Sequence, residues 1–204
     1  MDGFERRREL KKRNILDTAL NLFMTHGVQK VSIAEIASKA AVSQVTIYNY
    51  FESKDNLVHE VIIYYVNQVW KDYEQLFNSS LPFYEKVKQI IFNKKEIAAH
   101  IHEDFYQYIM KEYAKEKNDI EKLFNEKVLP RLIELFNEGK KQGYVDPSLS
   151  NEVILLYIQM FKEFFQRKDV YQVALPLTEE LTTLFFYGMY GKRDGKVMKN
   201  CKRL

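Results

Sequence analysis

Residues 32–57 read SIAEIASKAAVSQVTIYNYFESKDNL, and this stretch carries the start signals of two short helices. Ser32 stands three residues before Glu35, which is the spacing of a capping box: the serine hydroxyl accepts from a backbone N–H and the glutamate reaches back. Ser43 is a second favourable N-cap after a turn of about three residues. Two short capped helices joined by such a turn predict a helix-turn-helix motif over about residues 32–51.

The second of these helices has an outward face that carries no charge. Ile47 marks the centre of its buried face, and successive residues turn by about 100°. The side chains that this geometry places outward or on the flank, together with the first residue of the helix, are Gln44, Val45, Thr46, Tyr48 and Asn49. In a DNA major groove a valine can touch a thymine methyl and amides can pair with base edges, while hydroxyls reach phosphate oxygens. We therefore expect DNA contact; the alternative is a short helix packed against another protein.

Basic side chains on either side of the motif are candidates for phosphate contacts. Lys54 falls in the first turn of the helix that follows. Near the N-terminus six basic residues accompany one acid, Glu9, and they are Arg6, Arg7, Arg8, Lys11, Lys12 and Arg13. Such a cluster forms a local patch suited to phosphates, although a solvated helix face would have the same composition.

The residues around the motif resemble the DNA-binding domain of the TetR family of bacterial transcriptional regulators. The resemblance covers about residues 10 to 60 and lies in the run IAEIASKAAVSQVTIYNYFESKDNL, with ILDTALNLFMTHGVQKVS before it. Its features include Gly27, Val42-Ser43, Thr46-Ile47-Tyr48, Tyr50-Phe51, and Ser53-Lys54 with Leu57. The resemblance implies a three-helix DNA-binding domain, a larger helical ligand-binding and dimerisation domain, and usually repression that a small molecule releases.

The resemblance also implies roles for individual residues. The positions that would face DNA are Gln44, Val45, Thr46, Tyr48 and Asn49. Tyr48 and Lys54 would lie on phosphates, and Ser32 would lie near the DNA backbone. Two positions depart from the family pattern. Ala41 stands where the turn commonly has glycine, and a left-handed non-glycine residue there would cost about 1 to 2 kcal/mol. Val45 stands where glycine or proline is frequent, which affects the expected base preference and not the fold.

Composition favours an all-α protein. The chain has 204 residues with only 7 Gly and 4 Pro, too few turn-forming residues for a barrel or a sandwich. It has no apolar run of about 18 residues to span a bilayer, and its N-terminus lacks the apolar core of a signal peptide. Cys201 is the single cysteine and cannot form an internal disulfide, which fits a reducing compartment. We therefore expect a cytoplasmic protein with no membrane partner.

Helical periodicity continues through the rest of the chain and predicts about nine helices in all. Beyond the first three, helices are expected at about 53–77, 87–101, 105–113, 120–136, 150–165 and 178–189. Pro130 should kink the helix around 120–136. The expected domains are a helix-turn-helix DNA-binding domain at 1–52, a ligand-binding and dimerisation domain at 53–191, and a basic C-terminal tail at 192–204.

The helices around 150–165 and 178–189 are the candidates for homodimerisation. The first of them is apolar over more than one face, which exceeds what packing inside one subunit requires. The expected interface residues are Val153, Tyr157, Phe161, Phe164, Phe165, Leu181, Leu184 and Phe185. A twofold partner would complete a four-helix bundle and set two recognition helices about 34 Å apart on a near-palindromic operator. The alternative is complete burial within one subunit.

The residues that would bind a small-molecule effector carry a weaker signal. Aromatic side chains that could line a pocket for a hydrophobic ligand are Phe92, Phe105, Tyr106, Tyr108, Tyr113, Phe124, Tyr157 and Phe161, but aromatics at helical spacing are more typical of ordinary core. His100 and His102 are not expected to share a metal ion, because residues two apart on a helix point in nearly opposite directions. No cofactor or catalytic motif is present, so we expect neither a cofactor nor enzyme activity.

Overall fold

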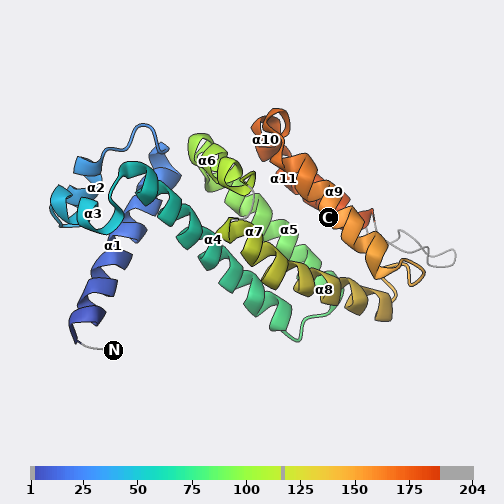
Figure 1. Ribbon diagram of the computed structural model, residues 1–204. Coiled ribbons are helices and arrows are strands. Elements are labelled where there is room, and N and C mark those ends of the chain that lie inside the picture. The colour runs from blue at the N-terminus through green and yellow to red at the C-terminus, as the bar shows by residue number, and fades with distance from the viewer. Residues whose placement is uncertain (1–2, 116–117, 189–204) are drawn as a thin grey trace. The chain divides into compact units, whose positions relative to one another are not determined.

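The computed structural model describes residues 3–115 and 118–188, and its elements are helices (Figure 1). The α-helices are α1 (Gly3–His26), α2 (Ile33–Lys39), α3 (Gln44–Phe51), α4 (Lys54–Asn78), α5 (Phe83–His100), α6 (Glu103–Tyr113), α7 (Asp119–Leu123), α8 (Leu129–Lys141), α9 (Asn151–Gln166), α10 (Lys168–Ala174) and α11 (Thr178–Tyr187). The expected all-α class is confirmed. None of the helices in the described ranges is long and apolar enough to cross a bilayer. The basic segment 192–204, with Cys201, lies outside the described residues.

The helices match the periodicity except in two places. The helix expected around 120–136 is divided by a π-helical turn, Phe124–Val128, in which the N–H of Leu129 bonds to the carbonyl of Phe124. Pro130 comes directly after Leu129 and has no N–H to donate. In a regular α-helix its ring would also clash with the carbonyl of the residue four positions earlier. The π turn therefore accommodates the proline that was expected to kink the helix. The second difference is α10, which periodicity did not predict and which a 3₁₀ turn, Leu175–Leu177, joins to α11.

The capping signals correctly predicted where α2 and α3 begin, whereas α1 starts at Gly3, a few residues before the expected start near residue 6. The Ser32 and Ser43 hydroxyls each accept from the backbone N–H three residues on, both at 3.1 Å. α1 ends at His26 and is followed by Gly27, whose φ of +79° is a left-handed conformation that suits glycine. Ala41 in the turn between α2 and α3 has a φ of +53°, so the expected left-handed strain is present without glycine.

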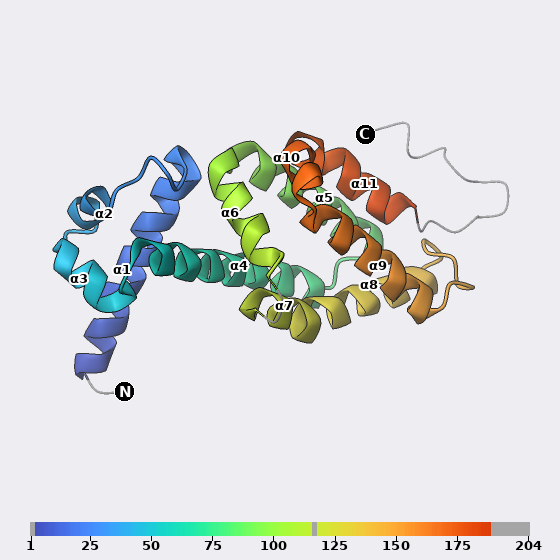
Figure 2. The ribbon, with the colours of Figure 1, turned by 45° about the horizontal axis from the view of Figure 1, so that its top comes forward.

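The chain divides into two compact units. The first contains the described residues up to Asp72 together with those of Ile97–Lys122, so it holds α1 to α3, most of α4, α6 and most of α7 (Figure 2). Its fully buried side chains include Phe23, Ile36, Ile47, Leu57, Ile62 and Phe105. The ring centroid of Phe105 lies 5.9 Å from that of Phe23 and 6.0 Å from that of Tyr65. This packing ties α6 to α1 and α4.

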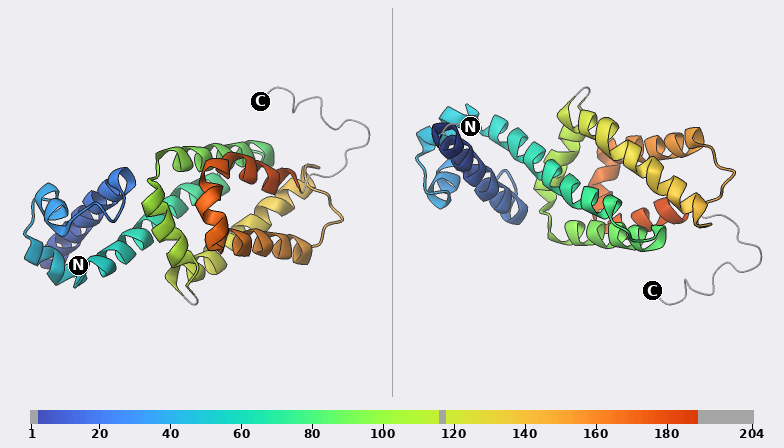
Figure 3. Two further views of the ribbon diagram at one scale, coloured as in Figure 1. Left: turned by 90° about the horizontal axis from the view of Figure 1, so that it is seen from above. Right: turned by 90° about the horizontal axis from the view of Figure 1, so that it is seen from below.

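The second unit contains Tyr73–Glu96 and the described residues from Leu123 onward, which form most of α5 and the helices α8 to α11 (Figure 3). Its core cluster consists of Leu76, Phe83, Val87, Ile90, Leu135, Phe136, Val145, Ile154, Ile158 and Phe186. Lys86 on α5 is buried, and its ammonium lies 2.9 Å from a carboxylate oxygen of Glu138 on α8. The buried charge is therefore paired, and it joins two helices of this unit.

Candidate nucleic-acid interface

α3 presents the uncharged outward face that the sequence predicted. Val45 is 67% exposed and Tyr48 is 46% exposed, and Gln44 and Asn49 are exposed as well. Ile47 on the opposite side is only 1% exposed. The helix therefore turns an apolar surface, two amides and a phenol toward solvent, while its buried side anchors it in the first unit.

Thr46 and Ser32 lie where hydroxyls can meet an anion. Thr46 is half-buried on the flank of α3, and its Oγ1 lies 2.9 Å from the Oγ of its N-cap, Ser43. Ser32 is exposed at the start of α2 and accepts the N–H of Glu35. A hydroxyl that accepts one hydrogen bond can still donate its own hydrogen. Helix N-termini also favour negative charge, so both hydroxyls have the chemistry for phosphate contacts.

Two left-handed residues other than glycine bracket α3. Ala41 precedes it with φ +53°, and Glu52 follows it with φ +63°. The N–H of Glu52 donates to the carbonyl of Tyr48 at 2.7 Å, which closes the last turn of α3. Each such conformation costs about 1 to 2 kcal/mol. The packed residues on both sides must therefore hold α3 in place against this strain.

The basic residues of α1 divide into an exposed group and one that is used within the protein. The exposed group along the first turns of α1 consists of Arg6, Arg7 and Arg8. The Arg8 guanidinium lies 5.9 Å from the ring centroid of Tyr50, whose hydroxyl donates to the Arg8 carbonyl at 3.3 Å. Lys12 instead pairs with Glu60 on α4 at 3.2 Å. These contacts fix the start of α1 beside the end of α3.

Lys54 is held from within the protein. Its ammonium donates to the carbonyls of Val28 and Val31, at 2.9 Å and 2.6 Å. Two of its three N–H donors are thus engaged by the loop between α1 and α2, and one is left for a phosphate. Sequence reasoning assigned Lys54 to phosphate alone, and its role in fixing that loop comes from the structure. No sequence pattern predicts this role, because both partners of Lys54 are backbone carbonyls more than twenty residues away.

A second contact that sequence reasoning missed joins α6 to the turn after α1. The N–H of His102 donates to the carbonyl of Met24, and the N–H of Gln29 donates to Oδ2 of Asp104, both at 3.0 Å. A Cβ on Gly27 would lie 2.9 Å from atoms of His102 and Asp104, so only glycine fits there. The His102 ring caps α6 by accepting the Asp104 N–H at 3.1 Å. The pair fixes the turn that leads into α2.

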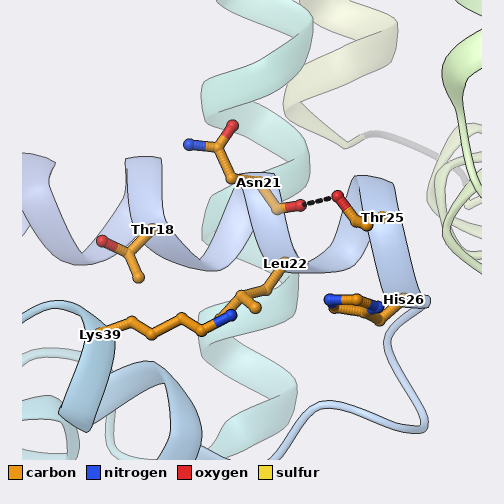
Figure 4. A pocket seen from close by; sticks show the side chains of 6 residues that line it. All are labelled: Thr18, Asn21, Leu22, Thr25, His26 and Lys39. Carbon is orange, nitrogen blue, oxygen red and sulfur yellow. Dashed lines mark hydrogen bonds between the residues drawn. The ribbon is translucent and has the colours of Figure 1, made fainter.

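A small open hollow lies between α1 and α2 (Figure 4). Its volume is about 270 Å³, and it is lined by Thr18, Asn21, Leu22, Thr25, His26 and Lys39. The Thr25 hydroxyl donates to the Asn21 carbonyl at 2.8 Å. Since Leu22 is the one apolar residue of this lining, the hollow does not have the chemistry expected of a site for a hydrophobic ligand.

The aromatic residues predicted for an effector pocket belong to both units. Phe105, Tyr106, Tyr108 and Tyr113 belong to the first, and Phe92, Phe124, Tyr157 and Phe161 belong to the second. Phe105 is fully buried core, whereas Phe92 is 55% exposed on α5. Burial raises the pKa of the Tyr113 phenol to about 12, so this hydroxyl stays protonated at neutral pH. Membership of a pocket stays a prediction for these residues.

The residues predicted for dimerisation fall into two groups, those half-buried within the subunit and those exposed to solvent. Tyr157, Phe161, Phe165, Leu181 and Phe185 are half-buried, and the Phe185 ring lies 5.3 Å from Tyr157 and 5.0 Å from Phe161. These rings join α9 to α11 within one subunit. The exposed apolar side chains are Val153, Leu156, Met160 and Phe164 on α9 and Leu184 on α11, with exposed fractions from 48% to 66%. At spacings of three and four residues, the four on α9 form one row, here called the α9 row.

Comparison with known proteins agrees with this geometry. The family model described as bacterial regulatory proteins, tetR family, matches residues 15–61. The HTH-type transcriptional repressor KstR2 of Mycolicibacterium smegmatis is 21% identical over 154 residues, which cover 73% of this chain and 74% of that protein.

Solved structures show a similar fold. FadR of Bacillus subtilis, in complex with stearoyl-CoA, has 19% identity and a TM-score of 0.52, over 87% of this chain and 99% of that one. A regulator of Saccharomonospora viridis, in complex with choline, has 16% identity and a TM-score of 0.62, over 89% and 98%.

The family match begins within α1 and ends within α4, so it covers the whole helix-turn-helix together with the second half of α1 and the first turns of α4. The similarity to a repressor and to solved regulators extends into the C-terminal helices. Residues 15–61 therefore form a DNA-binding domain of the TetR family of bacterial transcriptional regulators, in a chain that is similar to a transcriptional repressor over 73% of its length.

Proposed function

We propose that the protein is a ligand-responsive repressor that works in the bacterial cytoplasm. In this proposal a homodimer binds a near-palindromic operator and releases it when a small hydrophobic effector binds the helices of the C-terminal domain, residues 53–191. The observation that carries the DNA-binding part is the exposed uncharged face of α3, with Val45 67% exposed on a helix that Ile47 anchors. Contact with water alone does not favour an exposed valine, whereas the base edges of the major groove offer a methyl group for the valine and polar atoms for the amides.

The residues divide between reading bases and positioning the helix. Gln44, Val45 and Asn49 meet base edges from the outward face of α3. The groups that hold the DNA backbone are the hydroxyls of Ser32, Thr46 and Tyr48, the exposed guanidinium groups of Arg6, Arg7 and Arg8, and the remaining N–H of Lys54. Phosphate contacts fix the register of the protein on the duplex, and only the base contacts of Gln44, Val45 and Asn49 carry sequence information.

The α9 row supports the dimer. Four apolar side chains, 48% to 66% exposed, share one face of α9, and Leu184 on α11 is 59% exposed. Exposed contiguous apolar surface of this kind is typical of a protein interface. Two copies of α9 and α11 related by a twofold axis would form a four-helix bundle, in which each apolar row covers its counterpart.

Effector binding would act through a shift between two states. In one state the two recognition helices have the spacing of the operator half-sites, and in the other they do not. A ligand that binds the second state more tightly weakens operator binding by the difference between its two binding free energies, typically about 1 to 3 kcal/mol. α4 would carry the change, since it runs from the helix-turn-helix into the second unit. The contacts of His102 and Asp104 support α6 as an additional link to the turn after α1. Relatives in complex with stearoyl-CoA and with choline define two ligand classes to test by thermal shift.

Gel shifts test the DNA-binding function directly. Purified protein is titrated against random-sequence duplexes and against the region upstream of its own gene, between 50 and 200 mM salt. Phosphate contacts release counterions, so we expect affinity to fall by about 10³-fold or more over this range if six or more phosphates are contacted. An inverted repeat in the upstream region should bind more tightly than random duplexes. Absence of salt-dependent binding would favour the alternative, that α3 docks onto another protein.

A further inference from the structure

We propose that α3 reads an A·T-biased core in each operator half-site, and that Val45 recognises thymine through its 5-methyl group. This inference rests on the proposed operator binding and specifies the partner further. It follows from which base-reading groups α3 exposes and which it lacks.

The exposed face of α3 lacks the side chains that select G·C pairs. Guanine is read best by a bidentate Arg or Lys on O6 and N7, and cytosine is read by a carboxylate that accepts from its N4 amine. From Gln44 to Phe51, α3 contains no Arg, Lys, Asp or Glu. The cations nearest in sequence lie on other helices: Lys39 on α2 pairs with Glu35 at 3.6 Å, and Lys54 on α4 donates to the carbonyls of Val28 and Val31. α3 itself therefore offers no strong contact to guanine or cytosine.

The groups that α3 does expose fit adenine and thymine. Gln44 and Asn49 are amides that can pair bidentately with N6 and N7 of adenine. Val45 is the most exposed apolar side chain of α3, at 67%. The thymine methyl is the apolar feature of the major groove, and an apolar side chain is the group that recognises it.

Val45 is also held rigidly enough to discriminate. A β-branched side chain in a helix has essentially one χ1 rotamer, so its two methyls have fixed directions. It sits in the first turn of α3, which the Ser43 cap holds through the Thr46 N–H at 3.1 Å. The first turn of a recognition helix is the part that contacts base edges.

The experiment compares thymine with deoxyuridine, which lacks only the methyl. The full-length protein first selects its site from a library of random duplexes, and we expect A·T pairs at the core positions of each half-site. Single thymines of that core are then replaced by deoxyuridine. Burying one methyl is worth about a fourfold change in affinity, so we expect about fourfold weaker binding for one half-site and about 15-fold for both.

Three variants assign the effect to Val45. Val45→Ala should bind the thymine and the deoxyuridine duplexes equally, whereas Val45→Ile should retain the discrimination. Gln44→Ala should weaken binding and leave the ratio between the two duplexes near fourfold. Since Val45 is exposed, thermal unfolding of all three variants should match the original protein.

The outcomes separate this inference from the proposed function. A selected core of G·C pairs, or equal binding of the two duplexes by the original protein, overturns the inference and leaves operator binding intact. Failure to select any duplex overturns both. Discrimination that survives in Val45→Ala assigns the methyl contact to another residue and overturns the role of Val45.

Discussion

Two exposed faces of this molecule carry no charge, and they differ in chemistry. The outward face of α3 mixes one apolar side chain with amide and phenol groups, and Val45 is 67% exposed there. The α9 row contains only apolar side chains, from Phe164 at 48% to Met160 at 66% exposed. A base edge offers donors, acceptors and a methyl group, whereas the core of an interface between protein subunits is mainly apolar. The difference indicates that each face meets a different kind of partner.

The two faces are also supported differently. α3 is eight residues long and stands between two left-handed residues, Ala41 and Glu52. α9 has 16 residues and buries Ile154 and Ile158 in the core of the second unit. A short helix cannot hold itself in place, so the position of α3 depends on its caps and on contacts from α1 and α2. A long helix with a buried side can carry an exposed apolar row at less risk to its own stability.

The largest effect should come from placing a charge in the α9 row. In Leu156→Lys, a twofold dimer would bury two unpaired ammonium groups, each of which costs about 3 to 5 kcal/mol. We expect a monomer by light scattering, and a loss of operator affinity of about 100-fold or more because the two recognition helices are no longer linked.

Gln159→Lys is the matched control for Leu156→Lys. Gln159 is exposed on the same helix, but it lies about 100° from the centre of the row. This variant should remain a dimer with unchanged affinity. A dimeric Leu156→Lys protein would show that the row is not the interface, and the contrast between the two faces would lose its basis.

The next largest effect should fall on base reading by α3. Gln44→Ala removes a bidentate contact worth about 1 to 3 kcal/mol at the selected operator. Binding to random duplexes should stay nearly the same, because phosphate contacts supply it. Competition gel shifts with operator and random duplexes measure the ratio. Equal losses on both kinds of duplex would move Gln44 into the phosphate-binding group.

Lys54→Ala should weaken binding to every sequence by about tenfold and reduce the salt slope by about one. It should also lower stability by about 1.5 to 3 kcal/mol, because the carbonyls of Val28 and Val31 lose a charged donor. Salt-dependent gel shifts and thermal unfolding measure the two effects separately. If affinity and its salt dependence both stay intact, the phosphate assignment is wrong and Lys54 serves the loop alone.

The smallest effect should come from the turn that orients α3. Ala41→Gly removes a left-handed strain of about 1 to 2 kcal/mol and adds a backbone entropy cost of about 0.5 to 1 kcal/mol. We expect a gain in stability of up to about 1 kcal/mol by denaturant unfolding, with operator affinity unchanged. A fall in affinity despite the gain would mean that the strained turn sets the angle of α3.

The helix-turn-helix was readable from the sequence because its signals are local. The Ser32 and Ser43 caps each act over three residues, and Gly27 and Ala41 reveal turns by their position after a helix. The outward face of α3 followed from the helical period alone, once Ile47 was taken as its buried centre. These features depend on neighbours a turn away, which a single sequence displays.

The tertiary structure decided which of these residues serve the protein itself. Lys54 binds carbonyls 23 and 26 residues away, and Asp104 accepts the Gln29 N–H from 75 residues away. It also separated the half-buried rings around Phe185 from the exposed α9 row, although both are apolar in sequence. Local patterns specify helices and their buried sides. Which partner a side chain meets depends on contacts between distant segments, because packing brings them together only in the folded chain.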